Sequence, residues 1–485
     1  MGTQNNQTNG VSGGNGETKD AHVAGQTIQG TDLRGTLVRL NRHAAAFEIY
    51  NPALILRTSE VIENFKIVAR ERTIYFGKAV VRSLINAGSA AICEVTLSTG
   101  AWRDVQLGSE AGNQGLAAEF GEFLHGWQKN YKVSSDFKIA VADIQSFLMD
   151  LRVWVEQIEI GIRSSPTLNH SDQERAAIDE LREPVISALD TLFEKFETIS
   201  VALDEESRPA YRSYVQRHLH PIVLCAPFAY RSYEKPLGYA GDYELVNMMV
   251  GDPHQGGSLF AKIFNVWLLH QGSAAAHRNR IRILKQRLIE EAATAKREGR
   301  IASILSLGCG PAWEVREFME QSELCNSTQF TLLDFDEETL RHTSEALSQR
   351  QQRFNRTTSI NLVRRSVHQL LKNSVRSESL SGNGKFDFIY CAGLFDYLSD
   401  RTCKQLVGLF YDWLNPNGLV LVTNVTPSSP NQGSLELILD WHLNYRDTPR
   451  FKLLCPDAIP ADTIRVLSDE TGVNLFLEAR KPNGT

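Results

Sequence analysis

The feature that most restricts the fold of this chain is a short glycine-rich turn between an apolar strand and a helix. The segment SILSLGCGPAWEV runs from Ser303 to Val315 and places Gly308 and Gly310 directly after the apolar run. Glycines at such a turn let the main chain approach a bound ligand closely. From Ile301 onward, strand-like and helix-like segments alternate, which is typical of a doubly wound parallel sheet.

The end of the chain departs from this alternation. The runs SILSLG, QFTLLDFD, INLVRRS, KFDFIYCAG and GLVLVTNV predict five strands with helices between them. The tail TIRVLSDETGVNLFLEAR holds two apolar runs separated by Asp-Glu-Thr-Gly at 469–472, which predicts an antiparallel hairpin. A parallel sheet that ends in an antiparallel hairpin resembles the class I methyltransferase architecture, whereas nicotinamide-binding domains do not usually end in this way. We therefore expect a Rossmann-like α/β methyltransferase domain over 271–485.

The residues at 312 and 313 distinguish two kinds of ligand. A dinucleotide turn, GxGxxG, needs its third glycine at 313, where Trp313 stands. The turn that binds S-adenosylmethionine has its third glycine at 312, where Ala312 differs by one carbon. The turn thus favours S-adenosylmethionine as the cofactor.

Residues at the ends of the other strands complete the predicted cofactor site. Asp334 ends the second strand, where it can accept hydrogen bonds from both ribose hydroxyls, and Arg278 or Arg280 is placed to meet the cofactor carboxylate. The predicted cofactor-binding residues are Arg280, Gly308, Cys309, Gly310, Ala312, Asp334, Phe335, Ser366, Val367, Cys391, Ala392 and Gly393.

Two stretches point to the methyl acceptor. YEKPLGYAGDYELVNMMV (233–250) is interpreted as a lid over cofactor and substrate, with a plain connection between helices as the alternative. LELILDWHLNYRDTPRF places Trp441, Tyr445 and Arg446 on a predicted helix, either as an anion-binding group or as a buried aromatic face. The predicted catalytic residues are Tyr239, Asp242, Tyr243, Tyr397 and Arg446.

The kind of acceptor decides whether a base is needed. A carboxylate is already anionic at neutral pH, so alignment with the methyl donor supplies most of the catalysis. An alcohol or amine would need a general base, for which His277, Asp242 and His368 are the candidates.

The front of the chain divides into three parts. Residues 1–30 are polar and glycine-rich, and we expect a disordered tail. Short alternating runs over 31–112, including the run at 53–61, predict a small antiparallel β-barrel. Apolar residues at helical spacing predict a helical substrate and lid region over 113–270.

Two resemblances follow from these motifs. The barrel runs are similar to a PilZ domain, a module that often binds a cyclic dinucleotide, but Arg34, Arg39 and Arg42 lack the usual spacing and NPALILR at Asn51 lacks the serine and glycine. A degenerate barrel used for packing or for a homodimer is therefore favoured. KPLGYAGDYE, GCGPAWE, FDFIYCAGLFDYLSD and DWHLNYR resemble the bacterial extracellular-factor 3-hydroxypalmitic acid methyl ester biosynthesis family over roughly 120–480. That resemblance implies O-methylation of the carboxylate of a 3-hydroxy fatty acid to a quorum-signalling ester.

Composition restricts the partners. The net charge of −6 gives no basic patch for nucleic acid, and no stretch reaches the ~18 apolar residues of a membrane span. The seven cysteines show no metal-ligand spacing, so we expect no metal. Together with the absence of an apolar signal-peptide core, they indicate a cytoplasmic protein with reduced thiols. The alternative to an enzyme is a regulatory protein that binds S-adenosylmethionine or a cyclic dinucleotide without turnover.

Overall fold

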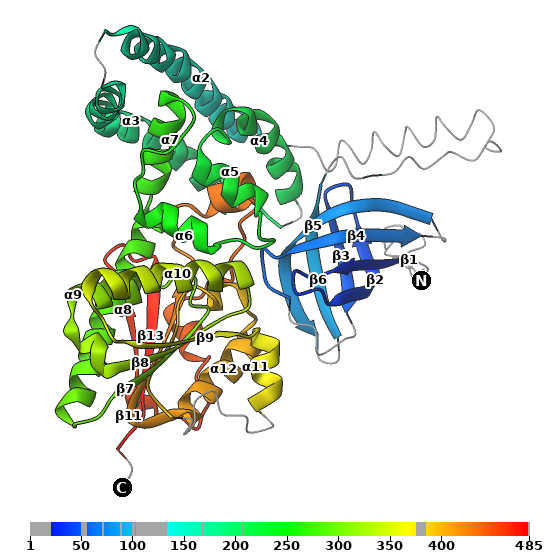
Figure 1. Ribbon diagram of the computed structural model, residues 1–485. Coiled ribbons are helices and arrows are strands. Elements are labelled where there is room, and N and C mark those ends of the chain that lie inside the picture. Colours follow the sequence, from blue (N-terminus) through cyan, green and yellow to red (C-terminus); the bar gives the residue numbers. More distant parts are fainter. Residues whose placement is uncertain are drawn as a thin grey trace, which may run out of the picture.

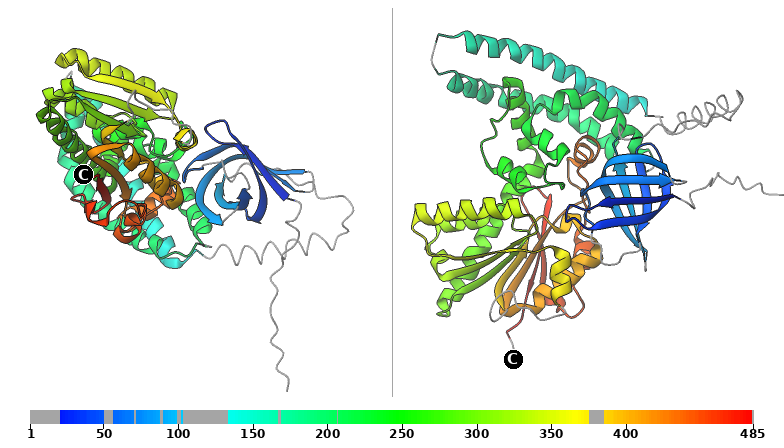
Figure 2. Two further views of the ribbon diagram at one scale, coloured as in Figure 1. Left: turned by 90° about the horizontal axis from the view of Figure 1, so that it is seen from below. Right: turned by 45° about the vertical axis from the view of Figure 1, so that its right-hand side comes forward.

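The chain is described from a computed structural model. It describes residues 21–49, 56–69, 72–87, 90–98, 102, 133–166, 169–205, 207–374 and 385–483. Figure 1 shows three parts: a β-barrel, a layer of helices, and an α/β domain that holds the C-terminus. In both views of Figure 2 the barrel lies beside the other two parts.

The barrel is closed and antiparallel, with the strand order β1-β2-β3-β6-β5-β4. Its strands are β1 (Ala21–Gln26), β2 (Asp32–Leu40), β3 (Ala44–Ile49), β4 (Val61–Ala69), β5 (Arg72–Ala87) and β6 (Ala90–Leu97). Alternate side chains such as Val23, Phe47, Phe65 and Val95 fill its interior. The predicted small barrel is confirmed.

Two details of the barrel differ from the sequence prediction. β1 lies inside the segment expected to be disordered, because Ala21 and Val23 form a short alternating pair within an otherwise polar stretch. The run predicted as a strand at 53–61 is instead a loop over its described residues 56–60, and β4 follows it. A β-bulge at Asn64, with φ of 51°, breaks the alternation of β4. Asn51 lies outside the described residues.

The helical layer is built by amphipathic helices. Its members are α2 (Ser135–Ser164), α3 (His170–Val201), α4 (Arg208–Val223), α5 (Pro227–Glu234), α6 (Tyr243–Val250) and α7 (Leu259–His270). Ser134 caps α2, which buries Phe137, Val141, Ile144 and Leu148 along one face. The prediction of a helical region is confirmed for the described part of 113–270.

A segment from the α/β domain enters this helical layer. The single turn η3 (Ser434–Ile438) packs in the same core as α2 and α4, and Glu197 of α3 accepts hydrogen bonds from the N–H groups of Gly433 and Ser434 at 2.6 and 2.8 Å. The predicted helix around Trp441 is wrong, because the turn ends before Asp440, whose φ is 52° and whose carboxylate pairs with Arg212.

The α/β domain contains a seven-stranded sheet with helices on both faces. Its elements are α8 (Gly272–Arg297), β7 (Ala302–Leu307), α9 (Trp313–Gln321), η1 (Glu323–Ser327), β8 (Thr328–Asp334), α10 (Glu337–Phe354), β9 (Ser359–Arg364), α11 (Val367–Ser374), β10 (Phe386–Cys391), η2 (Phe395–Tyr397), α12 (Asp400–Asp412), β11 (Leu414–Val425), α13 (Thr448–Lys452), η4 (Ala461–Thr463), β12 (Ile464–Ser468) and β13 (Asn474–Arg480). Helices α8, α9 and α10 share one core with the sheet, and α11, α12 and α13 share the other. Figure 1 shows this sandwich.

The strand order β12-β13-β11-β10-β7-β8-β9 confirms the predicted topology. β11, β10, β7, β8 and β9 are parallel, whereas β13 runs antiparallel to β11 and forms the terminal hairpin with β12. In such a sheet, ligands bind beyond the carboxyl ends of the strands. The loops after β7, β8 and β10 are therefore the place to look for the site.

Candidate cofactor and active site

A single cavity extends over the carboxyl ends of these strands. The glycine turn after β7, Asp334, and the turn after β10 form its floor, while Tyr239 and Tyr243 from the predicted lid form one wall. At one end, Val425, Leu435, Trp441 and Leu443 provide an apolar lining, which we call the apolar end. Residues of the segment interpreted as a lid and residues at the strand ends thus line the same cavity.

The glycine turn is held in shape by β8. The N–H groups of Gly308 and Cys309 both donate to the carbonyl of Leu333, at 2.8 and 3.0 Å. Gly308 and Gly310 have φ of 67° and 50°, which glycine adopts at little cost. A Cβ added at Gly310 would meet nothing within 4 Å, so the turn is open toward the cavity. Ala312 adopts the left-handed conformation that begins α9.

The structure explains why a tryptophan stands at position 313, where a dinucleotide turn has its third glycine. Its indole Nε1–H donates to the side-chain oxygen of Asn247 in α6 at 2.9 Å, and Arg316 lies over its ring. The side chain therefore ties the turn to the lid, where a glycine would leave a gap.

Asp334 completes the turn electrostatically. Its carboxylate accepts hydrogen bonds from the N–H groups of Gly310 and Asp336, both at 3.1 Å. Burial raises the pKa of the carboxyl, while these two hydrogen bonds oppose that shift. Phe335 follows at the cavity wall. A carboxylate with remaining acceptor capacity beside a glycine turn fits a pair of ribose hydroxyls.

Arg280 is a buried cation with no hydrogen bond or ion pair among the described residues. Its Nη1 lies 2.8 Å from the place where a Cβ of Gly393 would stand, so only glycine at 393 leaves room for it. Burial lowers the pKa of Arg280. Arg278, in contrast, donates to the carbonyls of Met249 and Leu269. Of the two predicted arginines, Arg280 is the one with donors free for a ligand carboxylate.

The three predicted tyrosines all line the cavity. Tyr239 hydrogen-bonds through its hydroxyl to Thr339 at 3.3 Å, and Tyr243 donates to Glu338 at 2.9 Å. The hydroxyl of Tyr397 accepts a hydrogen bond from Trp441 Nε1 at 2.9 Å, which leaves its own proton available to a ligand. Burial raises the pKa of all three phenols, that of Tyr243 to about 12, so they are neutral donors at pH 7.

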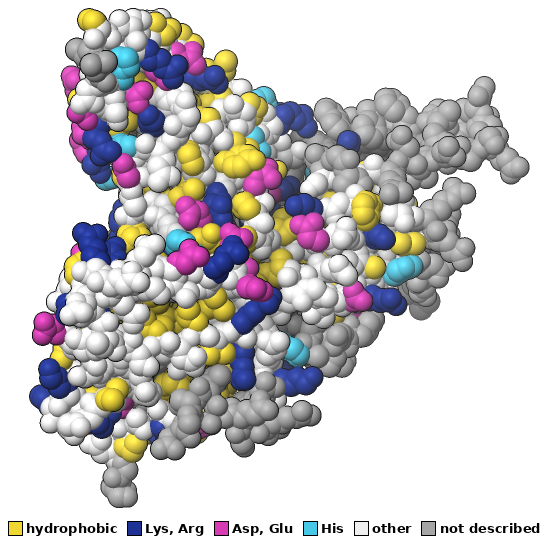
Figure 3. All heavy atoms as spheres, in the orientation of Figure 1, with side chains coloured by type: hydrophobic (Ala, Val, Ile, Leu, Met, Phe, Trp, Pro, Cys, Tyr) yellow, Lys and Arg dark blue, Asp and Glu magenta, His cyan; other side chains and the backbone are white. Residues whose placement is uncertain are grey.

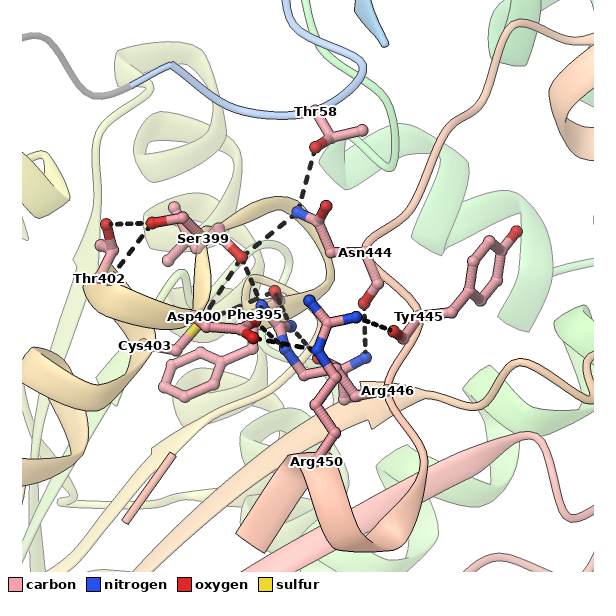
Figure 4. A network of polar contacts seen from close by, with 12 residues as sticks. Thr58, Phe395, Ser399, Asp400, Thr402, Cys403, Asn444, Tyr445, Arg446 and Arg450 are labelled. Atoms are coloured by element: carbon pink, nitrogen blue, oxygen red, sulfur yellow. Dashed lines mark hydrogen bonds and ion pairs between the residues drawn. The ribbon is translucent and has the colours of Figure 1, made fainter. Parts of the chain in front are cut away.

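Arg446 and Asp242, predicted as catalytic, are not among the residues that line the cavity. Arg446 is fully buried and donates to Asp400 at 2.8 Å and to the carbonyls of Phe395 and Leu398 at 2.8 and 2.6 Å (Figure 4). Its donors are occupied, so it cannot bind an acceptor. Asp242 caps α6 and pairs with Arg231 at 2.9 Å. Both side chains therefore stabilise the fold and are not available to bind a ligand.

The residues predicted at the ends of β9 and β10 differ in their position relative to the cavity. Val367, Ala392 and Gly393 line the cavity. Ser366 instead caps α11 through a reciprocal pair of hydrogen bonds with Gln369, and Cys391 is buried within the sheet. His368 also lies outside the cavity lining.

His277 faces the cavity but is a weak base. Burial and the charge of Arg280 lower its pKa to about 3, and its Nδ1 lies 3.2 Å from the carbonyl of Ser273. A carbonyl only accepts, so Nδ1 carries the proton and Nε2 is unprotonated. A base with so low a pKa removes protons poorly at pH 7.

Several lining residues were not predicted from the sequence, and four of them carry polar groups from distant parts of the chain. Arg57 and Thr58 reach the cavity from the barrel loop, and Ser429 and Asn474 line it near the apolar end. Ser429 Oγ and Asn474 Oδ1 are buried without a hydrogen-bond partner among the described residues. No local motif marks any of the four, because tertiary packing alone brings them here.

The described residues include no group of three or more side chains suited to a metal ion, and none of their helices is long and apolar enough to cross a bilayer. Positive and negative side chains are interspersed over the face in Figure 3.

Comparison with known proteins agrees with this geometry. Residues 276–476 match a family model described as a methyltransferase domain. The match runs from α8 into β13 and so includes the glycine turn, Asp334 and the whole cofactor floor. The match spans less than half of the chain. The matched part of the protein is a methyltransferase domain with a Rossmann-like fold.

No curated protein matches the chain significantly. Among solved structures, similarity is found to a possible exported protein from Bordetella parapertussis, with 16% identity, a TM-score of 0.40, and coverage of 66% of this chain and 100% of that one. Magnesium protoporphyrin IX methyltransferase from Synechocystis PCC 6803, solved with SAH, has 10% identity, a TM-score of 0.34 and coverage of 52% and 97%. The N-methyltransferase NodS from Bradyrhizobium japonicum has 13% identity, a TM-score of 0.30 and coverage of 52% and 100%. The assignment of the domain rests on the family match and the site.

Proposed function

We propose that the protein is an S-adenosylmethionine-dependent methyltransferase that converts the carboxylate of a small apolar acid, a 3-hydroxy fatty acid or a similar compound, to its methyl ester. The assignment of the cofactor rests on the hydrogen bond between Gly310 and Asp334, together with Arg280, which lines the same cavity and has no partner among the residues described. When bound, S-adenosylmethionine supplies an electrophilic methyl group that an acceptor oxygen takes by in-line displacement. Asp334 would hold the ribose and Arg280 the carboxylate of the cofactor.

The described residues that line the cavity include no competent base, which supports a carboxylate as the acceptor. His277 has a pKa near 3, and the carboxylates of Glu314 and Asp396 are engaged by Tyr390 and by the N–H of Val425, both at 2.7 Å. A carboxylate acceptor loses no proton in the transfer, so these residues need only position it. The free proton of Tyr397 is suited to orient such an anion.

The residues that line the apolar end suit an acceptor that has an acyl chain and a hydroxyl group. Leu435, Trp441 and Leu443 offer contact to an alkyl tail. Ser429 Oγ and Asn474 Oδ1 are buried polar atoms that have no partner within the described part of the chain, and such atoms normally obtain one. The side-chain amide of Asn474 donates to the carbonyl of Ala276 at 3.1 Å, so its oxygen is left to accept from a ligand hydroxyl.

The test is methyl transfer by the full-length protein from methyl-labelled S-adenosylmethionine. Acceptors are 3-hydroxy fatty acids of graded chain length, with the matching fatty alcohols and amines as controls. We expect an extractable labelled product that mild alkali cleaves, as it cleaves an ester. An alkali-stable product formed with the alcohols or amines would contradict the acceptor class, and binding of S-adenosylhomocysteine without transfer to any acceptor would favour a regulatory binding protein.

For the barrel, we propose a PilZ-like module without a working dinucleotide site. Arg39, one of the arginines considered for that site, forms an ion pair with Glu94 at 2.9 Å, so its guanidinium is already engaged within the barrel. Titration with a cyclic dinucleotide tests this, and saturable binding would contradict it. Homodimer formation through the barrel stays a prediction, as does the cytoplasmic location.

A further inference from the structure

One loop of the barrel leaves its own domain and enters the methyltransferase site. Residues 56–60, which precede β4, are buried although they form a loop. The Thr58 N–H donates to the carbonyl of Tyr397 at 3.1 Å, and the Val61 N–H donates to the carbonyl of Gly238 at 2.7 Å. The loop therefore lies between the lid segment and the turn after β10.

Ser59 fastens this loop at a second point. Its hydroxyl donates to the carbonyl of His442 at 2.9 Å and accepts from the His442 N–H at 2.6 Å. Ser59 has φ of 62°, a conformation that is costly for a residue with a side chain and persists where surrounding contacts enforce it. The docked position of the loop is thus specific.

Glu60 makes the loop rigid from within. Its carboxylate is buried and accepts hydrogen bonds from the N–H groups of Arg57 and Ile28, at 2.9 and 3.4 Å. The backbone of Arg57 is therefore held by the barrel, while its side chain extends toward the other domain.

The Arg57 guanidinium lies over the ring of Phe335 at 4.1 Å and lines the cavity. The residue is only 5% exposed, and no hydrogen bond or ion pair to its guanidinium is found among the described residues. Stacking uses the face of the guanidinium and leaves its in-plane N–H groups free. These N–H groups face the cavity, so a ligand that supplies acceptors there can pair with them.

Phe335 places Arg57 along the cavity. It directly follows Asp334, the residue suited to the ribose, whereas Arg280 lies beside Gly393. The position of Arg57 therefore corresponds to the adenosine end of the site. An adenosine group carries ring nitrogens and ribose oxygens that can accept from a guanidinium.

We propose that Arg57 is a cofactor-binding residue that the N-terminal barrel supplies to the methyltransferase domain, so that barrel docking and cofactor binding are linked. This inference rests on the proposed use of S-adenosylmethionine. Linkage is reciprocal: if the docked barrel strengthens cofactor binding, the bound cofactor holds the barrel in place by the same factor.

The test compares two ligands by calorimetry on the full-length protein. S-Adenosylhomocysteine contains the adenosine and amino-acid parts of the cofactor, and 5′-methylthioadenosine lacks the amino-acid part. We expect R57A to weaken both ligands by a similar factor of about ten or more, since hydrogen bonds to a charged group contribute ~1.5–3 kcal/mol. R280A should weaken S-adenosylhomocysteine alone.

Three further variants separate a binding role from a structural one. R34A removes an exposed arginine of the same barrel and should bind as wild type does. R57K retains the charge but not the planar stack and should recover only part of the affinity. S59A loosens docking without touching the cavity and should lose less affinity than R57A.

Each result decides the inference. Equal losses in S59A and R57A, or a loss in R57A for S-adenosylhomocysteine only, would overturn the assignment of Arg57 to the adenosine end. R57A that binds both ligands as wild type does would overturn this inference and leave the proposed function standing. Wild-type protein that binds neither ligand would overturn the proposed function as well.

Discussion

The Gly310 N–H donates a hydrogen bond to the Asp334 carboxylate at 3.1 Å, which joins the glycine turn after β7 to the end of β8. The two motifs that the sequence places 24 residues apart are therefore one structural unit. The acid shapes the turn and faces the cavity at the same time.

Replacement of Asp334 should mainly weaken cofactor binding. We expect D334A to weaken S-adenosylhomocysteine binding about 10- to 100-fold, because ribose hydroxyls and the Gly310 N–H lose a charged acceptor. Calorimetry measures the affinity, and the thermal midpoint shows whether the variant is folded. Unchanged affinity in folded D334A would refute the placement of the site.

Gly393 and Gly472 form a matched pair of left-handed glycines. Both have positive φ, 84° and 72°, so alanine at either costs ~1–2 kcal/mol of conformational energy. A Cβ at Gly393 would also displace the Arg280 guanidinium, whereas at Gly472 it would meet nothing within 4 Å. We expect both variants to melt earlier and only G393A to bind S-adenosylhomocysteine more weakly. Equal affinities would mean that Arg280 does not hold the cofactor.

Arg446 should contribute to the stability of the fold and not to binding of the cofactor or acceptor. R446M removes four hydrogen-bonding contacts of a fully buried side chain, to Asp400, Asn424 and two carbonyls, and we expect a loss of ~3 kcal/mol or more. The thermal midpoint should fall clearly. The affinity of the folded fraction for S-adenosylhomocysteine should stay as in wild type, and a selective loss of acceptor turnover without destabilisation would contradict this.

Ser429 should distinguish acceptors that carry a hydroxyl. If its buried Oγ binds the 3-hydroxyl group, S429A should lower kcat/KM for a 3-hydroxy acid about fivefold, an effect of ~1 kcal/mol. The unsubstituted acid of equal length serves as the control and should react as before. Parallel losses for both acids would remove Ser429 from acceptor recognition.

His442 makes stability depend on pH. Burial lowers its pKa to about 3, so below pH 6.5 the unfolded chain binds a proton that the folded chain does not. Stability should therefore fall as pH drops from 6.5 toward 3, with this residue contributing up to ~1.4 kcal/mol per pH unit. The buried Nε2 has no partner among the described residues, so H442F offers a ring of similar shape without the ionisation. Its thermal midpoint should decline less between pH 7.5 and 5.5. An unchanged decline would assign the effect to the other histidines whose pKa is lowered by burial, which are His43, His220, His277 and His342.

Several parts of the site were predictable because local sequence determines them. The glycine turn needs residues that tolerate positive φ, Asp334 ends an apolar strand, and Asp-Glu-Thr-Gly separates the runs of the terminal hairpin. Each of these features depends on neighbouring residues and on the period of the apolar pattern. The order of such segments also predicts the sheet, since connections in these folds follow few topologies.

Local sequence does not predict the roles of four arginines, which are Arg57, Arg278, Arg280 and Arg446. No sequence pattern distinguishes them, because the role of each depends on which of its donors have partners after folding. Arg446 lies in a pocket of carbonyls and Asp400, Arg278 reaches two carbonyls, and Arg280 and Arg57 are buried against the cavity without partners among the described residues. The sequence by itself determined the Rossmann-like domain and its cofactor turn, because short-range conformational preferences encode them. Only the tertiary structure decided which side chains from distant segments, above all from the barrel, enter the cavity, because burial and pairing of charges arise from packing between parts of the chain that no local pattern connects.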